Sequence, residues 1–289
     1  MISIVIASIR EDLLSQIIAN VDATVGIPYE IIAVNNLNTG KGICEVYNEA
    51  SKSAKYEYIC FVHEDVQFKT HKWGVNVVEH LKDQKTGLIG IAGSVYRSLV
   101  PSGWFTPEEF GKADWRLNIF QGAKNEIGTH REYLNPLDEH SSDVICLDGV
   151  LLCTKKSVLE KHQFDDQLLK GFHGYDIDFS LNVLTNYNVK VVYDVLIEHF
   201  SKGEFESAWL KEIDKVQRKW KRVLPLRVNK SIQDTDRENE RKAAKRFIKS
   251  MAKTAYFSKS EKVKHIIFYG STSLSFFEKS KYIIKVLLR

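Results

Sequence analysis

The sequence predicts an α/β fold with a mostly parallel central sheet, flanking helices and a basic, helical C-terminal extension. Three observations lead to this expectation. Short runs of apolar, β-branched residues alternate with segments of helical periodicity, a rhythm typical of parallel sheets. The first three runs each end in polar residues. The chain also changes from a mildly acidic body to a strongly basic tail near residue 205.

The first three strands of the predicted sheet are the clearest. Residues 2–8, ISIVIAS, form an apolar run typical of a buried strand, and the next segment has apolar residues at helical spacing. Residues 29–36 and 57–62 repeat the strand pattern, with a helical segment over 42–54 between them. Parallel strands end at the same edge of a sheet, so ASIR, NN and HED are expected to meet there. Open α/β sheets bind ligands at that edge.

The rest of the body is less regular. Residues 91–140 are dense in aromatic residues, Gly and Pro, and we expect long loops over a sheet edge. A strand, a turn at Asp148 and Gly149, a second strand and a short helix are expected next. A helix over 176–187 and a strand that ends at His199 complete the pattern.

Length and composition indicate a globular protein with a sizeable core. The chain has 289 residues, of which 44% are apolar. We expect a catalytic domain over 1–204 and an extension over 205–289. The four cysteines have no metal-like spacing and most lie in apolar runs, which indicates buried free thiols and a reducing cytoplasm. No signal peptide or membrane-spanning run is apparent, so a cytoplasmic protein is expected.

The tail carries most of the basic charge. Residues 201–289 contain 23 Lys and Arg against 10 Asp and Glu, whereas the first 200 residues contain 18 against 27. Phe247, Ile248 and Met251 share one helical face among lysines, a pattern that favours contact of residues 236–289 with an anionic membrane surface at the inner face of the cell membrane. Alternatively, these apolar faces pack on the body or on a second subunit in a homodimer.

Ionisable side chains at the predicted strand ends suggest the chemistry. The carboxylates of Glu64, Asp65, Asp176 and Asp178 and the imidazole of His199 are of the types that hold Mg²⁺ or Mn²⁺, and a carboxylate that is not bound to metal can accept a proton from a hydroxyl. The alternative explanation for these residues is structural. Polar residues often end a strand, and Asp176 and Asp178 are also suited to the start of a helix. Neither GxxxxGK[ST] nor GxGxxG is present, so phosphate binding by those glycine loops is not expected.

The ordered blocks of the chain resemble the inverting family-2-type glycosyltransferases with the GT-A fold, in particular the branch related to streptomycin-biosynthesis transferases. The similarity covers about residues 2–203 and includes VHED, GLIGIAGSVYR, PSGW, DGVLL, GYDID and IEHFSKG. It implies metal-dependent transfer of a sugar from a nucleotide-diphosphate donor to a glycan or lipid-linked acceptor. Surface polysaccharide or lipopolysaccharide-type biosynthesis is the implied setting.

The resemblance also implies site residues. Asp65 matches the metal and diphosphate residue, His199 the second metal ligand and Asp176 the general base. His63 and Tyr175 stand where the family more often has acidic residues. The implied donor-binding residues are Ala7, Ser8, Arg10, Asn35, Asn36, Asn48, Glu64 and Asp65. The implied acceptor or sugar residues are Trp104, Asp148, Gly149 and Asp178.

Two other classes of function stay open from the sequence. The departures at His63 and Tyr175 are compatible with a GT-A module that binds a nucleotide-sugar or glycan without turnover. The basic and aromatic residues of the tail permit a nucleic-acid binder, but no recognised motif supports it, and nucleic acid is not an expected partner.

Overall fold

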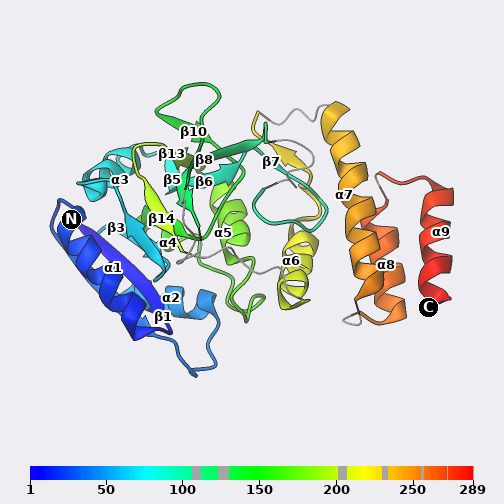
Figure 1. The fold of residues 1–289 in the computed structure, drawn as a ribbon, viewed down its shortest axis with the longest axis horizontal. Helices are drawn as coiled ribbons and strands as arrows, with labels where there is room; N and C mark the ends of the chain where they lie inside the picture. The colour runs from blue at the N-terminus through cyan, green and yellow to red at the C-terminus, as the bar shows by residue number, and fades with distance from the viewer. Residues whose placement is uncertain are drawn as a thin grey trace.

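A computed structural model gives the fold (Figure 1). The structure describes residues 1–105, 112–122, 130–200, 207–229, 234–254, 257–271 and 273–288. The expected domain boundary near residue 205 lies outside these residues and stays a prediction.

The central sheet has seven strands in the order β10-β13-β5-β12-β3-β1-β2. These strands are β1 (Ile2–Ser8), β2 (Tyr29–Asn35), β3 (Tyr58–Val62), β5 (Thr86–Gly90), β10 (Ser141–Asp143), β12 (Leu151–Lys155) and β13 (Asn188–Val192). As expected, β1 runs parallel to both β2 and β3.

The sheet is mixed: β1, β2, β3, β5 and β13 run in one direction, as expected of a mostly parallel sheet, and β12 and β10 run in the opposite direction. β12 lies antiparallel to both β3 and β5, and β10 lies antiparallel to β13. The chain turns at Asp148 and Gly149 beside the carboxyl end of β3, where the backbone N–H of His63 donates to the Val150 carbonyl at 3.2 Å. A strand that starts at this edge can only run back across the sheet.

A second sheet occupies the region that the sequence suggested would be loops. It consists of β4 (Val66–Phe68), β6 (Ala92–Ser94), β8 (Trp115–Gln121), β9 (His130–Leu134), β11 (Cys146–Leu147) and β14 (Ile197–His199). In β8 the apolar Trp115, Leu117 and Ile119 alternate with the polar Arg116 and Asn118, and all five side chains are buried. The predicted strand ending at His199 is two strands, β13 and β14, which belong to different sheets.

Helices cover both faces of the central sheet. α1 (Glu11–Thr24) and α3 (Trp73–Leu81) pack in the core cluster between the two sheets, together with side chains of β4 and β8. α2 (Ile43–Ser53), α4 (Lys156–Leu159) and α5 (Tyr175–Leu184) pack in the cluster on the other face. All four cysteines are buried and free, as expected.

The C-terminal region packs on the body through buried side chains. It contains α6 (Ser207–Trp220), α7 (Asp234–Lys253), α8 (Lys259–Tyr269) and α9 (Phe276–Leu287), and β15 (Leu226–Arg227) pairs with β7 (Tyr96–Arg97). In α6, Ile213 and Val216 join the core of the body. Figure 1 shows α7, α8 and α9 at the end of the molecule farthest from β1.

The expectation that the apolar face of α7 meets a membrane is wrong. Phe247, Ile248 and Met251 are at most 6% exposed and pack in a third cluster with Leu99 and Val100 of the body. Within the described residues, no helix combines the length and apolar character needed to cross a bilayer.

Candidate active site

Three strand ends meet at one edge of the central sheet, as the sequence predicted. Ser8 at the end of β1 is in register with Asn35 at the end of β2, and the backbone N–H of Asn36 donates to the Ser8 carbonyl at 2.7 Å. The segment His63–Asp65 follows β3 beside them.

Glu64 anchors the loop that follows β1. Its carboxylate accepts hydrogen bonds from the Ser8 hydroxyl at 2.5 Å and from the backbone N–H groups of Ile9 at 3.3 Å and Arg10 at 3.1 Å. Glu64 therefore shapes the loop expected to hold the donor base. Its implied role in donor binding stays a prediction.

The predicted metal ligands Asp65 and His199 come together because β14 pairs with β4. The antiparallel register sets His199 opposite Val66, and the backbone N–H of Phe200 donates to the Asp65 carbonyl at 3.0 Å. His199 Nε2 then lies 3.5 Å from Asp65 Oδ1. The other ring nitrogen, Nδ1, lies 3.4 Å from the side-chain oxygen of Gln121.

His63 completes a group of three ligand atoms. Its Nδ1 lies 3.9 Å from Asp65 Oδ1, and ligand atoms of His63, Asp65 and His199 all lie within 4.8 Å of one another. The sequence indicated His63 only as a departure from the acidic residue expected there. The spacing His-x-Asp was the signal for its place in this group.

The electrostatics of the group suit metal binding. Burial disfavours the charged form of Asp65, but hydrogen bonding and charge attraction from His199, with further attraction from His63, outweigh it and lower the pKa of the carboxyl. Burial, together with the neighbouring His199, lowers the pKa of His63. An ionised carboxylate beside a neutral imidazole is what a divalent ion requires.

Asp176 has a very different environment at the start of α5. Burial and the nearby negative charge of Asp148 raise the pKa of Asp176 to about 7, although backbone hydrogen bonds and the charge of Arg97 oppose the shift. A carboxyl group with a pKa near neutrality can accept a proton at physiological pH. Asp148 itself accepts the backbone N–H of Val150 at 2.8 Å.

Gly149 and Tyr175 join the turn at Asp148 to the metal-binding group. The Tyr175 hydroxyl lies 3.2 Å from the Gly149 carbonyl oxygen and 2.7 Å from His63 Nε2. A Cβ atom at Gly149 would lie only 2.1 Å from this hydroxyl, so the close approach requires glycine here. Nothing in the sequence indicated this contact beyond the presence of Tyr where an acidic residue was expected.

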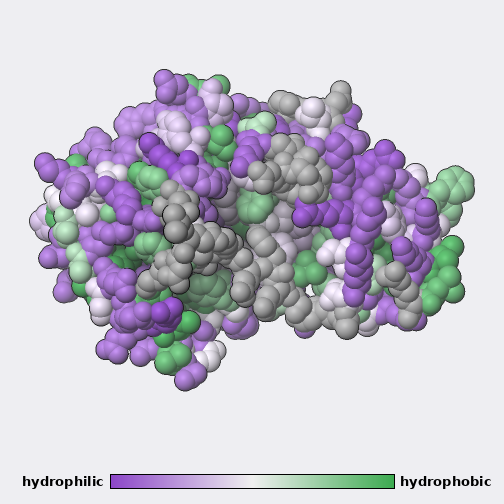
Figure 2. Space-filling view, viewed as in Figure 1, coloured by the Kyte–Doolittle hydropathy of each residue, from purple (hydrophilic) through white to green (hydrophobic). Residues whose placement is uncertain are grey.

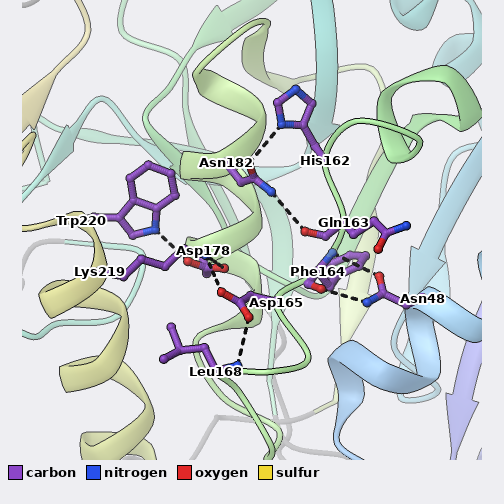
Figure 3. A network of polar contacts seen from close by, with 10 residues as sticks. All are labelled: Asn48, His162, Gln163, Phe164, Asp165, Leu168, Asp178, Asn182, Lys219 and Trp220. Carbon is purple, nitrogen blue, oxygen red and sulfur yellow. Dashed lines mark hydrogen bonds and ion pairs between the residues drawn. The ribbon is translucent and has the colours of Figure 1, made fainter.

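Two predicted site residues are buried among protein partners (Figure 3). Asp178, 1% exposed, accepts from Lys219 Nζ at 2.8 Å and from Trp220 Nε1 at 2.7 Å, both from α6. Asn48, 6% exposed, exchanges hydrogen bonds with the backbone of Phe164. Both connect helices and loops of the body, and these contacts leave little room for the predicted contacts with acceptor or donor.

The remaining predicted residues lie near the strand ends or in the second sheet. The exposed Arg10 pairs with Asp12 at 2.7 Å, and Asn35 Oδ1 accepts the backbone N–H of Leu37 at 2.9 Å. Trp104 is half-buried against Phe105 and Trp115. Ala7 is partly buried against the core, and Asn36 Nδ2 donates to the Lys41 carbonyl at 3.2 Å. The roles of these residues stay predictions.

Comparison with solved structures shows the same fold in several glycosyltransferases. A mannosyltransferase of Pyrobaculum calidifontis with GDP-Man and Mn²⁺ matches with a TM-score of 0.54 and 12% identity, over 99% of this chain and 86% of that one. S. aureus TarS 1-349 matches with 0.54 and 11% identity, over 94% and 81%. GalNAc-T7 with UDP, GalNAc and Mn²⁺ matches with 0.53 and 11% identity, over 98% of this chain but 57% of that one.

These likenesses confirm an α/β fold similar to that of GT-A glycosyltransferases. No curated protein sequence matches the chain significantly. A family model described as "Glycosyltransferase like family" matches residues 3–222, which is most of the chain and includes every residue of the candidate site. The chain therefore belongs to the glycosyltransferase-like family.

Proposed function

We propose that this protein is a metal-dependent glycosyltransferase that moves a sugar, with inversion, from a nucleotide-diphosphate donor to a hydroxyl of a glycan or lipid-linked acceptor. The proposed setting is surface polysaccharide or lipopolysaccharide-type biosynthesis, as in the streptomycin-type branch that the sequence resembles. The observation that carries the proposal is the group His63, Asp65 and His199 at the carboxyl edge of the sheet. Solved structures of similar fold contain Mn²⁺ with UDP or GDP-Man.

The side chains of His63, Asp65 and His199 suit a divalent ion as ligands. One ionised carboxylate and two imidazoles converge there, and these are ligands that Mn²⁺ accepts. When bound, the ion would offset the charge of a diphosphate leaving group. Asp65 and His199 would hold it, and the loop anchored by Glu64 would lie beside the donor base.

Asp176 is the proposed general base. Its carboxyl has a pKa of about 7, so a large share is ionised at neutral pH and able to remove the proton of an acceptor hydroxyl. Asp148 lies close enough to Asp176 for its charge to help raise that pKa.

A membrane role is proposed for α9 instead of α7. Phe277, Ile284 and Leu288 recur at helical spacing and are 83%, 56% and 83% exposed, with the exposed Lys281 and Lys285 among them. Figure 2 shows hydrophobic surface at the edge of the molecule formed by α9. Apolar side chains flanked by lysines suit an anionic bilayer at the cytoplasmic face, where a lipid-linked acceptor would be presented.

Asp65→Ala should abolish Mn²⁺-dependent binding of the donor nucleotide, because it removes the carboxylate that both histidines face. A thermal-shift panel of nucleotide diphosphates with Mn²⁺ identifies the nucleotide that binds the wild type, since ligands of the native state raise its apparent stability. Titration calorimetry with that nucleotide then compares the variants. Asp143→Ala, which removes an exposed carboxylate on β10, is the control. Unchanged affinity in Asp65→Ala would refute the assignment.

Asp176→Asn should reduce transfer by about 10²-fold or more while donor affinity stays near normal, because the amide keeps the size but not the basicity. Wild-type transfer should fall as the pH drops below about 7, where Asp176 becomes protonated, and the variant should lose this dependence. The raised pKa also means that Asp176 lowers the stability of the folded protein progressively as the pH rises from 3.8, the ordinary pKa, to about 7, and the variant should lack this contribution.

The control for this experiment is Asp143→Asn, which should keep both the rate and the pH profile. If Asp176→Asn retained most of its turnover, the protein base would have to be sought elsewhere. If the wild type bound donor but transferred nothing to any glycan or lipid-linked acceptor, a binding module would be the better assignment.

Replacing both Phe276 and Phe277 by Ser should reduce pelleting with anionic vesicles by about tenfold or more, because each aromatic side chain contributes about 1.5–3 kcal/mol when removed from water. Binding should also weaken at high salt. Leu137→Ser, which changes a 66% exposed leucine of the body, is the matched control. Equal pelleting of the double variant and wild type would exclude α9 as the contact.

A further inference from the structure

His63 and Tyr175, the two residues at which the chain departs from the acidic pattern, are in direct contact. His63 Nε2 lies 2.7 Å from the Tyr175 hydroxyl. Because the two positions are 112 residues apart in the chain, the fold itself brings them together. Each departure alone removes a carboxyl group, but together they create a hydrogen-bonded pair beside Asp65.

The Tyr175 side chain is held in one orientation. It is 3% exposed and its ring packs edge-on against Tyr47 and at a tilt against Phe164. Its hydroxyl fits against Gly149 only because that residue has no Cβ. The position of the hydroxyl is therefore set by the core of the body.

The hydrogen bonds of this hydroxyl determine the tautomer of His63. The Gly149 carbonyl can only accept, so the single proton of the Tyr175 hydroxyl is directed to it. With its proton directed to Gly149, the hydroxyl accepts from His63 at 2.7 Å, and we infer from this arrangement that the ring proton is on Nε2. His63 Nδ1 is left with a free lone pair, and this is the atom that faces Asp65.

We propose that His63 binds the metal ion through Nδ1 as a third protein ligand with Asp65 and His199, and that Tyr175 is the positioning residue that fixes His63 in the required tautomer. This inference rests on the proposed function, because it concerns the same ion. A hydrogen bond to the far nitrogen of a metal-binding imidazole is a common means of orienting the ring. The side-chain amide of Gln121 likewise lies at the far nitrogen of His199, with its nitrogen 3.3 Å and its oxygen 3.4 Å from Nδ1.

The proposal also narrows the choice of metal. Two imidazole nitrogens and one carboxylate favour Mn²⁺, Co²⁺ or Zn²⁺ over Mg²⁺, which prefers oxygen ligands. The sequence alone left Mn²⁺ and Mg²⁺ as equal alternatives, because it indicated one carboxylate and one histidine only.

A second group of similar composition must be controlled for. His80, His140 and Asp194 also place ligand atoms within 4.8 Å of one another, and His80 Nε2 lies 2.9 Å from Asp194 Oδ1. These residues belong to α3, the segment before β10 and the turn between β13 and β14. A measurement of metal binding must therefore separate the two groups.

The test is a titration of the full-length, metal-free protein with Co²⁺, followed by its visible absorption and by calorimetry. His63→Gln and Tyr175→Phe should each weaken Co²⁺ binding at the group His63, Asp65 and His199 about 10–100-fold and alter the absorption bands. Tyr175→Phe retains the buried ring, so thermal unfolding without metal should show a folded protein. His140→Gln, which removes a ligand of the second group, should leave the Co²⁺ absorption of the group His63, Asp65 and His199 unchanged. Mg²⁺ should bind the wild type more weakly than Co²⁺.

Undiminished Co²⁺ affinity and unchanged bands in His63→Gln would overturn the proposal, and the same result in Tyr175→Phe alone would overturn the positioning role. Asp65→Ala separates this failure from failure of the proposed function. If Asp65→Ala loses the Co²⁺ absorption of this group while His63→Gln keeps it, only the assignment of His63 as a third ligand is wrong. If Asp65→Ala also keeps this absorption, the group does not hold the ion, and the proposed function fails together with the inference.

Discussion

The candidate site depends on the antiparallel pairing of β4 with β14. This short ladder sets His199 opposite Val66 and lets Phe200 bond the Asp65 carbonyl. Asp65 comes from the end of β3 in the central sheet, whereas His199 arrives on a strand of the second sheet. The candidate metal-binding group therefore forms where the two sheets meet, and the core cluster between them, with α1 and α3, holds that junction in place.

Two carboxyl groups of the site have pKa values that shift in opposite directions because their surroundings differ. Burial acts against the charged form of both. At Asp65 the two histidines more than compensate and lower the pKa, whereas at Asp176 the neighbouring Asp148 adds to the effect of burial and raises the pKa to about 7. One group is thereby suited to hold a cation and the other to exchange a proton. Environments that separate the pKa values of two acids are a recurrent feature of catalytic sites.

The sequence predicted those features of the fold and of the site that depend on residues close together in the chain. The three parallel strands and the edge at which Ser8, Asn35 and Asp65 meet follow from apolar runs that end in polar residues. The reversed direction of β12 did not follow, because it depends on a turn whose position beside β3 is a tertiary fact. The second sheet was missed because three of its strands, β6, β8 and β9, are short runs within a stretch that is dense in Gly, Pro and aromatic residues.

Residues with long-range partners were the ones that the sequence could not place. Asp178 looked like a site residue beside Asp176, but it faces α6, where Lys219 and Trp220 bind it. Phe247 and Met251 looked like a membrane face, and they are covered by α8 and the body. His63 and Tyr175 looked like losses of function, and their contact became visible only in three dimensions.

The central claim is that the group His63, Asp65 and His199, where the two sheets meet, binds a divalent cation. X-ray diffraction from crystals grown with Mn²⁺, with data collected near the manganese absorption edge, tests it most directly. The account predicts an anomalous peak within coordination distance of Asp65 and His199. A peak confined to His80, His140 and Asp194, or no peak at Asp65 and His199 while Mn²⁺ is bound elsewhere, would contradict it.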